Sequence, residues 1–467
     1  RDAQESRGLG DVYKRQRRGE LVSCFLLEVD DSLNSINFID STAKQLSKIG
    51  GGVAINLSKL RARGEAIKGI KGVAKGVLPV AKALEGGFSY ADQLGQRPGA
   101  GAVYLNIFHY DVEEFLDTKK VNADEDLRLS TISTGLIVPS KFFDLAKEGK
   151  DFYMFAPHTV KQEYGVTLDD IDIEKYYDEL VANPNVLKKK KDAREMLNMI
   201  AQTQLQSGYP YLMFKDNANK VHANSNIGQI KMSNLCTEIF QLQETSIIND
   251  YGIEDEIKRD ISCNLGSLNI VNVMETGKFR DSVHTGMDAL TVVSDEANIQ
   301  NAPGVKKANN ELHSVGLGVM NLHGYLAKNK IGYESEEAKD FANIFFMMMN
   351  YYSIERSMEI AKERGEAYQD FDKSDYASGK YFDFYTSQEF VPQFEKVKEL
   401  FANMQIPTSE DWKSLQQQVQ EYGLYHAYRL AIAPTQSISY VQNATSSVMP
   451  IVDQIERRTY GNAETFY

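Results

Sequence analysis

The sequence contains few cysteines and no long apolar run, and each shortage excludes a class of protein. Its 467 residues include three cysteines, Cys24, Cys236 and Cys263, and no two of them are spaced as CxxC. This spacing excludes a secreted disulfide framework and a cysteine zinc site. The richest apolar run, residues 344–349, is too short to cross a membrane. No cationic leader followed by an apolar stretch occurs, so we expect no secretion signal. We therefore expect a cytoplasmic protein without a membrane segment.

Positive charge is also in short supply. The 52 Lys and Arg residues are outnumbered by 65 Asp and Glu residues, which gives a net charge of −13. Such a charge argues against nonspecific binding to nucleic acid. The hydrophobic fraction of 42% is that of an ordinary globular protein, and the length allows more than one structural unit.

Periodicity separates a short leader from a folded region. Residues 1–16 show no useful periodicity and are interpreted as a leader foreign to the fold, whereas residues 17–467 form the folded domain. Strands are predicted around residues 103–107, 136–138 and 152–155, where apolar residues alternate or cluster. The mixture of strands with the helices described next indicates the α/β class.

Two helices have clear boundaries in the sequence. One contains the apolar positions Phe341 and Phe345, with Ser335 as a plausible N-cap and Gly365 as the residue after its end. The other covers residues 194–207 and stops at Gly208.

Two suggestive motifs carry little weight. The lysine run at residues 188–191 is interpreted as a solvated loop rather than an anion site. Gly316 and Gly318 resemble part of a dinucleotide-binding turn, but Asn321 stands where the third glycine is needed, so we reject a dinucleotide site.

The most informative segment is residues 233–238, with the sequence SNLCTE. In an extended chain Asn234, Cys236 and Glu238 would share one face, bringing an amide, a thiol and a carboxylate together. A neighbouring carboxylate raises the pKa of a thiol, which disfavours a thiolate nucleophile and suits a neutral S–H or S• group. A half-buried strand whose polar face meets solvent is the alternative explanation.

The other two cysteines lie in apolar, strand-like segments. Cys24 is within residues 21–28 (LVSCFLLE) and Cys263 within residues 262–269 (SCNLGSLN). Cysteines are often small buried hydrophobic residues, which would explain each of them separately. That explanation accounts less well for all three occurring in such segments.

Residues 434–439 (PTQSIS) offer hydroxyl groups and backbone N–H groups at a predicted helix start. The N-terminus of a helix favours an anion, so this segment is a candidate phosphate site. An ordinary capped helix start fits the residues equally well.

These segments resemble a known family. SNLCTEI and SCNLGSLNI closely resemble two signature segments of the large subunits of class I ribonucleotide reductases, and RGELVSCFLLEVDDSLNSI resembles the segment with the third active-site cysteine. GGGVAINLSKLRARG, QRPGAGAVYLNIFHYDVEEFLDTKK and APTQSISYVQNATSSVMPI fit in the family's order. The likeness covers about residues 17–467 and is greatest to the bacterial Ib branch.

The resemblance implies a fold and a reaction. The fold is a ten-stranded α/β barrel of two five-stranded halves, with the radical cysteine on a loop inside and the last part missing from this chain. The reaction is reduction of ribonucleoside diphosphates to 2′-deoxyribonucleoside diphosphates. Cys236 becomes the thiyl radical that abstracts the ribose 3′ hydrogen, Glu238 takes the 3′-hydroxyl proton, and Asn234 holds the hydroxyl groups. Cys24 and Cys263 supply two electrons and form a disulfide.

The resemblance also implies two nucleotide sites. The substrate site would contain Ser23, Cys24, Gly52, Asn234, Leu235, Cys236, Thr237, Glu238, Pro434, Thr435, Gln436, Ser437 and Ile438. An effector site for deoxynucleoside triphosphates or ATP would contain Asp31, Ser32, Leu33, Arg61, Lys68, Gln93 and Arg97. In the family, the segment matched by residues 92–102 transmits the effector signal to the substrate.

Partners follow from the resemblance as well. The chain itself is expected to bind no metal, and its radical would come from a small subunit with a dimanganese or diiron centre. A thioredoxin- or glutaredoxin-like reductant and a homodimer of the full-length chain are also expected. The family's tyrosine pair and mobile cysteine pair would lie beyond Tyr467, so we expect the chain as given to be inactive.

Two alternatives remain. One is a fragment that binds nucleotides without turnover. The other is a related glycyl-radical or cobalamin-dependent enzyme, although the sequence contains neither a glycine-radical motif nor a recognisable cobalamin site.

Overall fold

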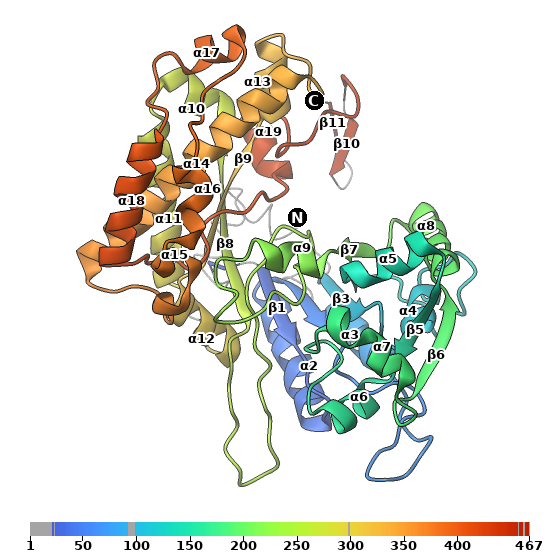
Figure 1. Ribbon diagram of the computed structural model, residues 1–467. Helices are drawn as coiled ribbons and strands as arrows, with labels where there is room; N and C mark the ends of the chain where they lie inside the picture. The colour runs from blue at the N-terminus through green and yellow to red at the C-terminus, as the bar shows by residue number, and fades with distance from the viewer. Residues whose placement is uncertain are drawn as a thin grey trace. The chain divides into compact units, whose positions relative to one another are not determined.

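The computed structural model describes residues 21–22, 24–91, 99–297, 299–455, 457–460 and 463–466. Contacts divide the chain into two compact units (Figure 1). The N-terminal unit comprises Cys24–Ser262 with Asn298–Ala308, and the C-terminal unit comprises Cys263–Ala297 with Asn309–Tyr467. The predicted leader lies outside the described residues. Within the described part of the chain, no helix combines the length and apolar character needed to span a membrane.

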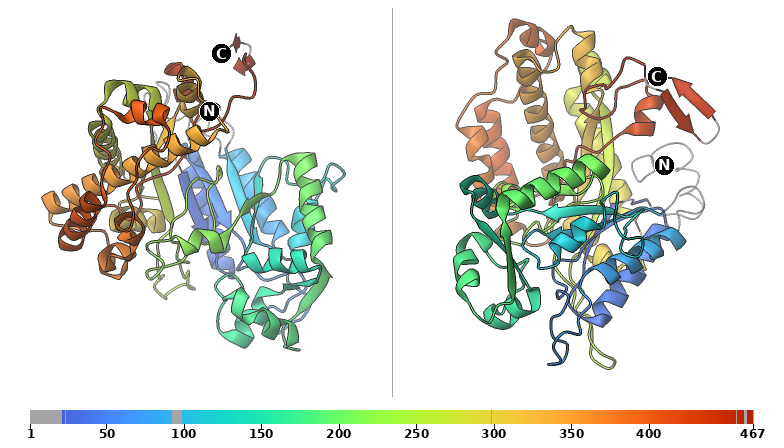
Figure 2. Two further views of the ribbon diagram at one scale, coloured as in Figure 1. Left: turned by 45° about the horizontal axis from the view of Figure 1, so that its top comes forward. Right: turned by 90° about the vertical axis from the view of Figure 1, so that its right-hand side faces the viewer.

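A five-stranded parallel sheet forms the core of the N-terminal unit. Its strands follow the order β7-β4-β3-β2-β1, and all residues of β1 to β4 are buried. Burial on both faces is typical of parallel sheets and explains the apolar runs seen in the sequence. Helices α2 and α3 pack against each other and against β1–β3 (Figure 2, blue). The strands are β1 (Cys24–Glu28), β2 (Gly52–Asn56), β3 (Gly101–Asn106), β4 (Ser133–Ile137) and β7 (Tyr211–Met213).

Helices follow the strands of this unit along the chain. The helices are α2 (Leu33–Lys48), α3 (Leu78–Tyr90), α4 (Val112–Asp117), α5 (Ser140–Glu148), α6 (Pro157–Tyr164), α7 (Ile173–Ala182), α8 (Ala193–Ser207) and α9 (Lys215–Lys220). The predicted helix at residues 194–207 is confirmed as α8, and Gly208 ends it in the left-handed conformation.

The prediction for the lysine run is wrong. Lys188–Asp192 forms strand β6, which pairs in antiparallel fashion with β5 (Asp151–Phe155). Lys189 and Lys191 both form ion pairs with Glu113, at 3.2 and 3.0 Å. A carboxylate between two lysines on one side of the strand compensates for their low strand propensity.

The C-terminal unit is mainly helical around two parallel strands, β8 (Ile261–Asn269) and β9 (Val315–Met320). The predicted long helix is confirmed as α14 (Glu336–Arg364), with Ser335 as its N-cap and Gly365 as its left-handed C-cap. Gly316 and Gly318 lie inside β9, where a Cβ atom at Gly316 would come within 3.0 Å of the Cys263 sulfur. These glycines therefore allow close packing within a strand and do not form a turn.

The other elements follow β8 in the chain, and α12 begins within the segment Asn298–Ala308 of the N-terminal unit. The helices are α10 (Ile270–Thr276), α11 (Phe279–Asp295), α12 (Pro303–Leu312), α13 (Leu322–Lys328), α15 (Asp375–Ser378), α16 (Asp383–Thr386), α17 (Glu395–Phe401), α18 (Ser409–Tyr422) and α19 (Gln436–Val441), with 3₁₀ turns at Phe371–Lys373 and Lys380–Phe382 and a hairpin of β10 (Arg457–Tyr460) and β11 (Ala463–Phe466). The α/β class predicted from the sequence is confirmed.

Candidate functional site

Cys236 lies on a tight turn, so residues 233–238 do not form the extended chain considered above. The Thr237 N–H donates to the carbonyl of Asn234 at 3.2 Å, which closes the turn. Thr237 has a φ of 66°, a left-handed conformation that is strained for a β-branched residue. Strained backbone of this kind persists where the surroundings impose it, and it concentrates at functional sites. Alternating polar residues therefore marked a turn rather than a sheet face.

The Asn234 side chain gives this turn its shape. Its Oδ1 accepts hydrogen bonds from the backbone N–H groups of Glu238, at 2.9 Å, and Ile239, at 3.1 Å. The turn therefore brings Asn234 and Glu238 to either side of Cys236 without strand geometry. Asn234 Nδ2 is buried and hydrogen-bonds to none of the described residues. A buried amide donor without a partner is unusual and indicates space for an acceptor.

A single row of residues crosses the parallel sheet beneath this segment. Strand register aligns Glu28 with Asn56, Asn56 with Tyr104, Tyr104 with Gly135, and Gly135 with Tyr211. Residues in register on parallel strands point to the same face, so these side chains share one face of the sheet. We call these five residues the register row.

Tyr104 connects the register row to the turn. Its hydroxyl donates to the Asn234 carbonyl at 2.9 Å. Gly135 makes room for the ring, because a Cβ atom there would lie 2.4 Å from a ring carbon. Burial raises the pKa of Tyr104 above its ordinary value, and nearby Cys236 and Glu238 add to the rise, although a hydrogen bond from Thr237 opposes it. Tyr104 is therefore a neutral phenol beside the turn.

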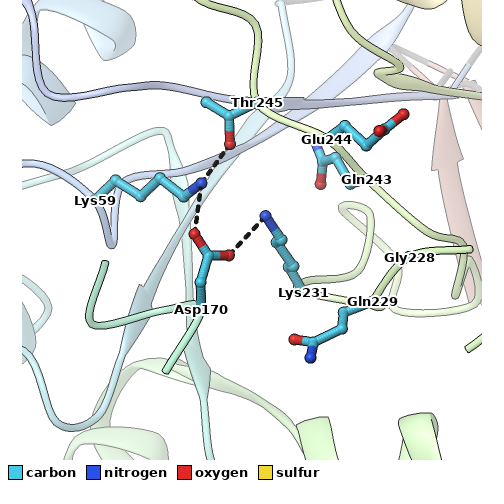
Figure 3. Close-up of a pocket in the computed structure, with 8 residues that line it drawn as sticks. All are labelled: Lys59, Asp170, Gly228, Gln229, Lys231, Gln243, Glu244 and Thr245. Atoms are coloured by element: carbon cyan, nitrogen blue, oxygen red, sulfur yellow. Dashed lines mark hydrogen bonds and ion pairs between the residues drawn. The ribbon is translucent and has the colours of Figure 1, made fainter. Parts of the chain in front are cut away.

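Lys231 connects the other end of the same segment to the row. Its ammonium group lies 3.1 Å from Glu28 and 2.9 Å from Asp170. Lys59 also contacts Asp170, at 3.0 Å, and donates to the Thr245 hydroxyl at 2.5 Å (Figure 3). Figure 3 shows both lysines pointing toward the carboxylate of Asp170 from opposite sides, at the edge of a pocket of about 380 Å³.

Charges in this network stabilise one another. Burial alone would raise the pKa of Asp170, but Lys231 and Lys59 hold it well below its usual range. Burial would lower the pKa of Lys231, but Glu28 and Asp170 raise it. Asp260 differs, because burial and the nearby Glu28 carboxylate raise its pKa to about 8. Asp170 is therefore ionised and Lys231 protonated, whereas Asp260 is a neutral acid.

The other predicted cysteines occupy strands, as expected from their apolar segments. Cys24 is the first residue of β1, where it is aligned with Gly52 of β2, so these two predicted substrate residues lie side by side. Cys263 lies on β8 of the C-terminal unit and is buried. All three cysteines are thiols in this structure. Cys24 and Cys263 belong to different units, so their pairing stays a prediction.

The predicted phosphate segment does begin a helix. Thr435 is the residue preceding α19, and its hydroxyl accepts a hydrogen bond from the Ser447 N–H at 2.7 Å. Pro434 is exposed and Ile438 is half-buried. The side chains of Gln436 and Ser437 lie outside the described part of the structure. Helix formation at this point agrees with both explanations, so binding of a diphosphate stays a prediction.

Four predicted effector residues lie together at the end of β1. Arg61 contacts both carboxylate oxygens of Asp31 and also donates its backbone N–H to that carboxylate at 3.0 Å. Ser32 caps α2, and the side chain of Leu33 is 71% exposed. Lys68 stands on an exposed turn with a φ of 51°. Ser23, Gln93 and Arg97 lie outside the described residues.

One cluster in the C-terminal unit has the composition of a metal site. His284, Glu355 and Glu359 offer ligand atoms that lie within 4.8 Å of one another. Arg280, however, contacts Glu355 at 2.7 Å and Glu359 at 3.0 Å. Because the guanidinium already neutralises both carboxylates, the cluster is an ion-pair network between α11 and α14.

Sequence reasoning missed Tyr104, Lys231, Glu28 and Asp170. The two lysines of the network, Lys59 and Lys231, lie far apart in the sequence, so no local pattern joins them. One signal was present in the sequence: Gly135 interrupts a segment that is otherwise buried strand. A glycine inside a strand indicates close approach of another group, here the ring of Tyr104.

Comparison with known proteins identifies the family. Residues 22–467 match the family described as "Ribonucleotide reductase, barrel domain". The chain belongs to the ribonucleotide reductase family. The α/β class agrees with this membership.

Curated relatives support the same assignment. The chain is 57% identical to the ribonucleoside-diphosphate reductase subunit alpha of Bacillus subtilis, over 97% of this chain and 65% of the relative. It is 44% identical to the subunit alpha of Mycoplasma pneumoniae, over 97% of this chain and 63% of the relative. The NrdEB subunit alpha of Bacillus subtilis is 31% identical, which fits the Ib branch. The chain thus spans slightly less than two thirds of the length of the two subunits alpha that are 57% and 44% identical to it.

Proposed function

We propose that this chain is the catalytic part of a ribonucleoside-diphosphate reductase. The observation that carries the proposal is the buried Asn234 Nδ2, which has no hydrogen-bond partner among the described residues and lies on the same turn as Cys236 and Glu238. A donor of this kind suits a ribose hydroxyl, which can accept its hydrogen bond. A ribose bound in this way would bring its 3′ carbon and 3′ hydroxyl to the thiol of Cys236 and the carboxylate of Glu238.

The three residues of the turn would divide the first part of the reaction. Cys236, as a thiyl radical, abstracts the 3′ hydrogen of the ribose, and Glu238 accepts the 3′-hydroxyl proton. Asn234 holds the hydroxyl groups in place. Cys24 and Cys263 then supply two electrons and two protons, so that the 2′-hydroxyl leaves as water and the cysteines close a disulfide. A reductant of the thioredoxin or glutaredoxin type restores the two thiols.

Other parts of the assembly are proposed from the same family membership. The relatives are named as alpha subunits, and we propose a small subunit with a manganese or iron pair as the radical source. Residues from Pro434 to Ile438, with Ser23 and Gly52, would bind the substrate diphosphate. Asp31, Ser32, Leu33, Arg61, Lys68, Gln93 and Arg97 would bind a deoxynucleoside triphosphate or ATP in a cytoplasmic homodimer.

The test measures deoxycytidine diphosphate formed from cytidine diphosphate, with a small subunit and dithiothreitol present. We compare the 467-residue chain with a version extended to the length of its relatives. We expect product only from the extended version. Product from neither, with cytidine diphosphate still bound in calorimetry, would favour a nucleotide-binding role without turnover. Comparable product from both would contradict the expected inactivity of the shorter chain.

A further inference from the structure

The segment Lys231–Glu238 depends on two separate sets of contacts. One set determines its shape, and the other determines its position on the parallel sheet. Its shape comes from internal hydrogen bonds, those of Asn234 Oδ1 and the bond from the Ser233 hydroxyl to the Ile239 carbonyl at 2.9 Å. At its base, an isolated bridge joins Ile230 to Leu242. Internal bonds do not determine where a loop lies on the rest of the protein.

Its place on the sheet comes from contacts with the register row. Lys231 reaches Glu28 on β1, and the Asn234 carbonyl accepts from Tyr104 on β3. Two strand spacings separate β1 from β3, which is about 10 Å. Three residues of extended chain span about the same distance. The segment therefore crosses the strands along the row, with one contact at each end of the crossing.

We propose that Tyr104 and Lys231 are positioning residues, which hold the turn bearing Cys236 at one place on the parallel sheet. The proposal deepens the proposed function and rests on it for the turnover measurements described below. Neither residue is assigned to the chemistry itself. They act through the Asn234 carbonyl and through the chain that leads to Cys236.

Three observations support this role for Tyr104. Its hydroxyl hydrogen is committed to a backbone carbonyl of the turn, at 2.9 Å. Its ring is fully buried. Gly135, the residue aligned with it on β4, leaves the volume that the ring fills. A rigid ring in a fitted space places its hydroxyl more accurately than a flexible side chain does.

Lys231 provides the second contact by charge. Only 8% of it is exposed, and it lies between the carboxylates of Glu28 and Asp170. A buried ion pair is costly to break, because the remaining charges lose their partner. The position of the Lys231 ammonium group between the two carboxylates is thus strongly preferred. This preference fixes where the segment begins on the sheet.

The first experiment compares Tyr104→Phe with Tyr177→Phe in the extended protein paired with its small subunit. Tyr177 is a matched control, because it is also buried in the N-terminal unit and its hydroxyl also bonds to backbone groups, of Tyr153 and Asp151. We expect Tyr104→Phe to lower kcat about 10- to 100-fold, since a small misplacement of reacting groups has that effect, with KM changed by less than about threefold. Tyr177→Phe should change neither.

The second experiment follows Cys236 without turnover. We expect iodoacetamide to alkylate Cys236 about fivefold to tenfold faster in Tyr104→Phe, because loss of one hydrogen bond makes the turn more mobile. Peptide mass spectrometry assigns the modified cysteine. This readout stays valid if the wild-type protein reduces no ribonucleotide, in which case the proposed function fails and the positioning role is still tested.

The third experiment tests the ion pair. Lys231→Met should raise the alkylation rate of Cys236 and lower kcat, and Lys231→Arg, which keeps the charge, should recover most of both values. Lys215→Met is the control, since Lys215 is also 8% exposed and pairs with Asp169 in the same unit. If Lys231→Met does not fold, Lys231→Arg and Tyr104→Phe remain informative. Cys236 alkylation and kcat in Tyr104→Phe equal to those of Tyr177→Phe would overturn the proposal.

Discussion

Cys24 and Cys236 belong to the same unit, yet the structure holds them in different ways. Cys24 begins β1, and the hydrogen bonds of the β1–β2 pair fix its backbone. Cys236 lies on a turn beside a strained Thr237, and side chains from distant strands locate that turn. A backbone ladder tolerates changes of side chain, whereas a turn held by side chains does not. The two cysteines should therefore respond differently to mutation.

The largest expected effect comes from replacing Cys24 with serine, which removes the redox-active thiol and keeps the backbone of β1 in place. Cys24→Ser should reduce turnover to background, because the two-electron donor is lost, yet Cys236 alkylation should stay at the wild-type rate.

In the wild-type protein, one turnover without external reductant should yield a Cys24–Cys263 disulfide, detectable as a linked peptide. This requires Cβ atoms about 3.5–4.5 Å apart when oxidised. Undiminished turnover in Cys24→Ser, or absence of the linked peptide, would contradict the pairing.

A smaller effect is expected on the turn itself. Glu238→Gln should lower kcat about 10²- to 10⁴-fold, the usual contribution of a positioned general base, with nucleotide affinity nearly unchanged. Glu244→Gln is the control, because Glu244 is outside the turn and pairs with Arg259 at 3.5 Å. Steady-state kinetics measures the change in kcat, and calorimetry measures the change in nucleotide affinity. Full activity in Glu238→Gln would mean that this carboxylate has no acid–base role.

A change at the far end of β1 should affect selection rather than catalysis. Asp31→Ala releases Arg61 from its carboxylate partner, and we expect the preference among effector triphosphates to change about 5- to 150-fold. Asp30→Ala is the neighbouring control, since Asp30 contacts Lys161 rather than Arg61. Calorimetry with each triphosphate, at a measured oligomeric state, provides the test. Identical preferences in wild type and Asp31→Ala would count against an effector site here.

The smallest expected effect on turnover concerns Asp260, which should instead alter stability. Its folded pKa of about 8 lies above the unfolded value, so the folded protein keeps a proton that the unfolded chain releases. Stability should therefore fall as pH rises from about 4 to about 8, by at most about 1.4 kcal/mol per pH unit from this group. Asp260→Asn should remove that contribution. Urea unfolding at several pH values tests it, and an unchanged slope would show that Asp260 is ionised in the folded protein.

Local features could be predicted from the sequence with good accuracy. The ends of α14 and α8 follow from Ser335, Gly365 and Gly208, because capping depends on residues within one turn of the helix. Cys24 and Cys263 lie on strands as their apolar neighbours indicate. The importance of the residues around Cys236 for the chemistry stays a prediction, which rests on their types and on the family resemblance.

Features that depend on distant partners could not be predicted. Residues 188–191 form a strand because they pair with β5 and because Glu113 forms an ion pair with Lys189. Neither partner can be inferred from the lysine run itself. Asn234 accepts backbone N–H groups four and five residues later, which converts an apparent strand into a turn. The contacts of Lys231 and Tyr104 join segments more than 100 residues apart. Register, rather than spacing along the chain, creates these contacts.

Gly135 has a consequence for how relatives of this chain are compared. Its missing side chain and the ring of Tyr104 occupy one shared volume, so a side chain cannot be added at position 135 while the ring of Tyr104 is kept. A methyl group at position 135 would require a smaller residue at position 104, and the hydroxyl above it would be lost. In an alignment of relatives, positions 104 and 135 therefore have to be compared together. The role of Tyr104 can be assigned to another sequence only when the residues at both positions are considered.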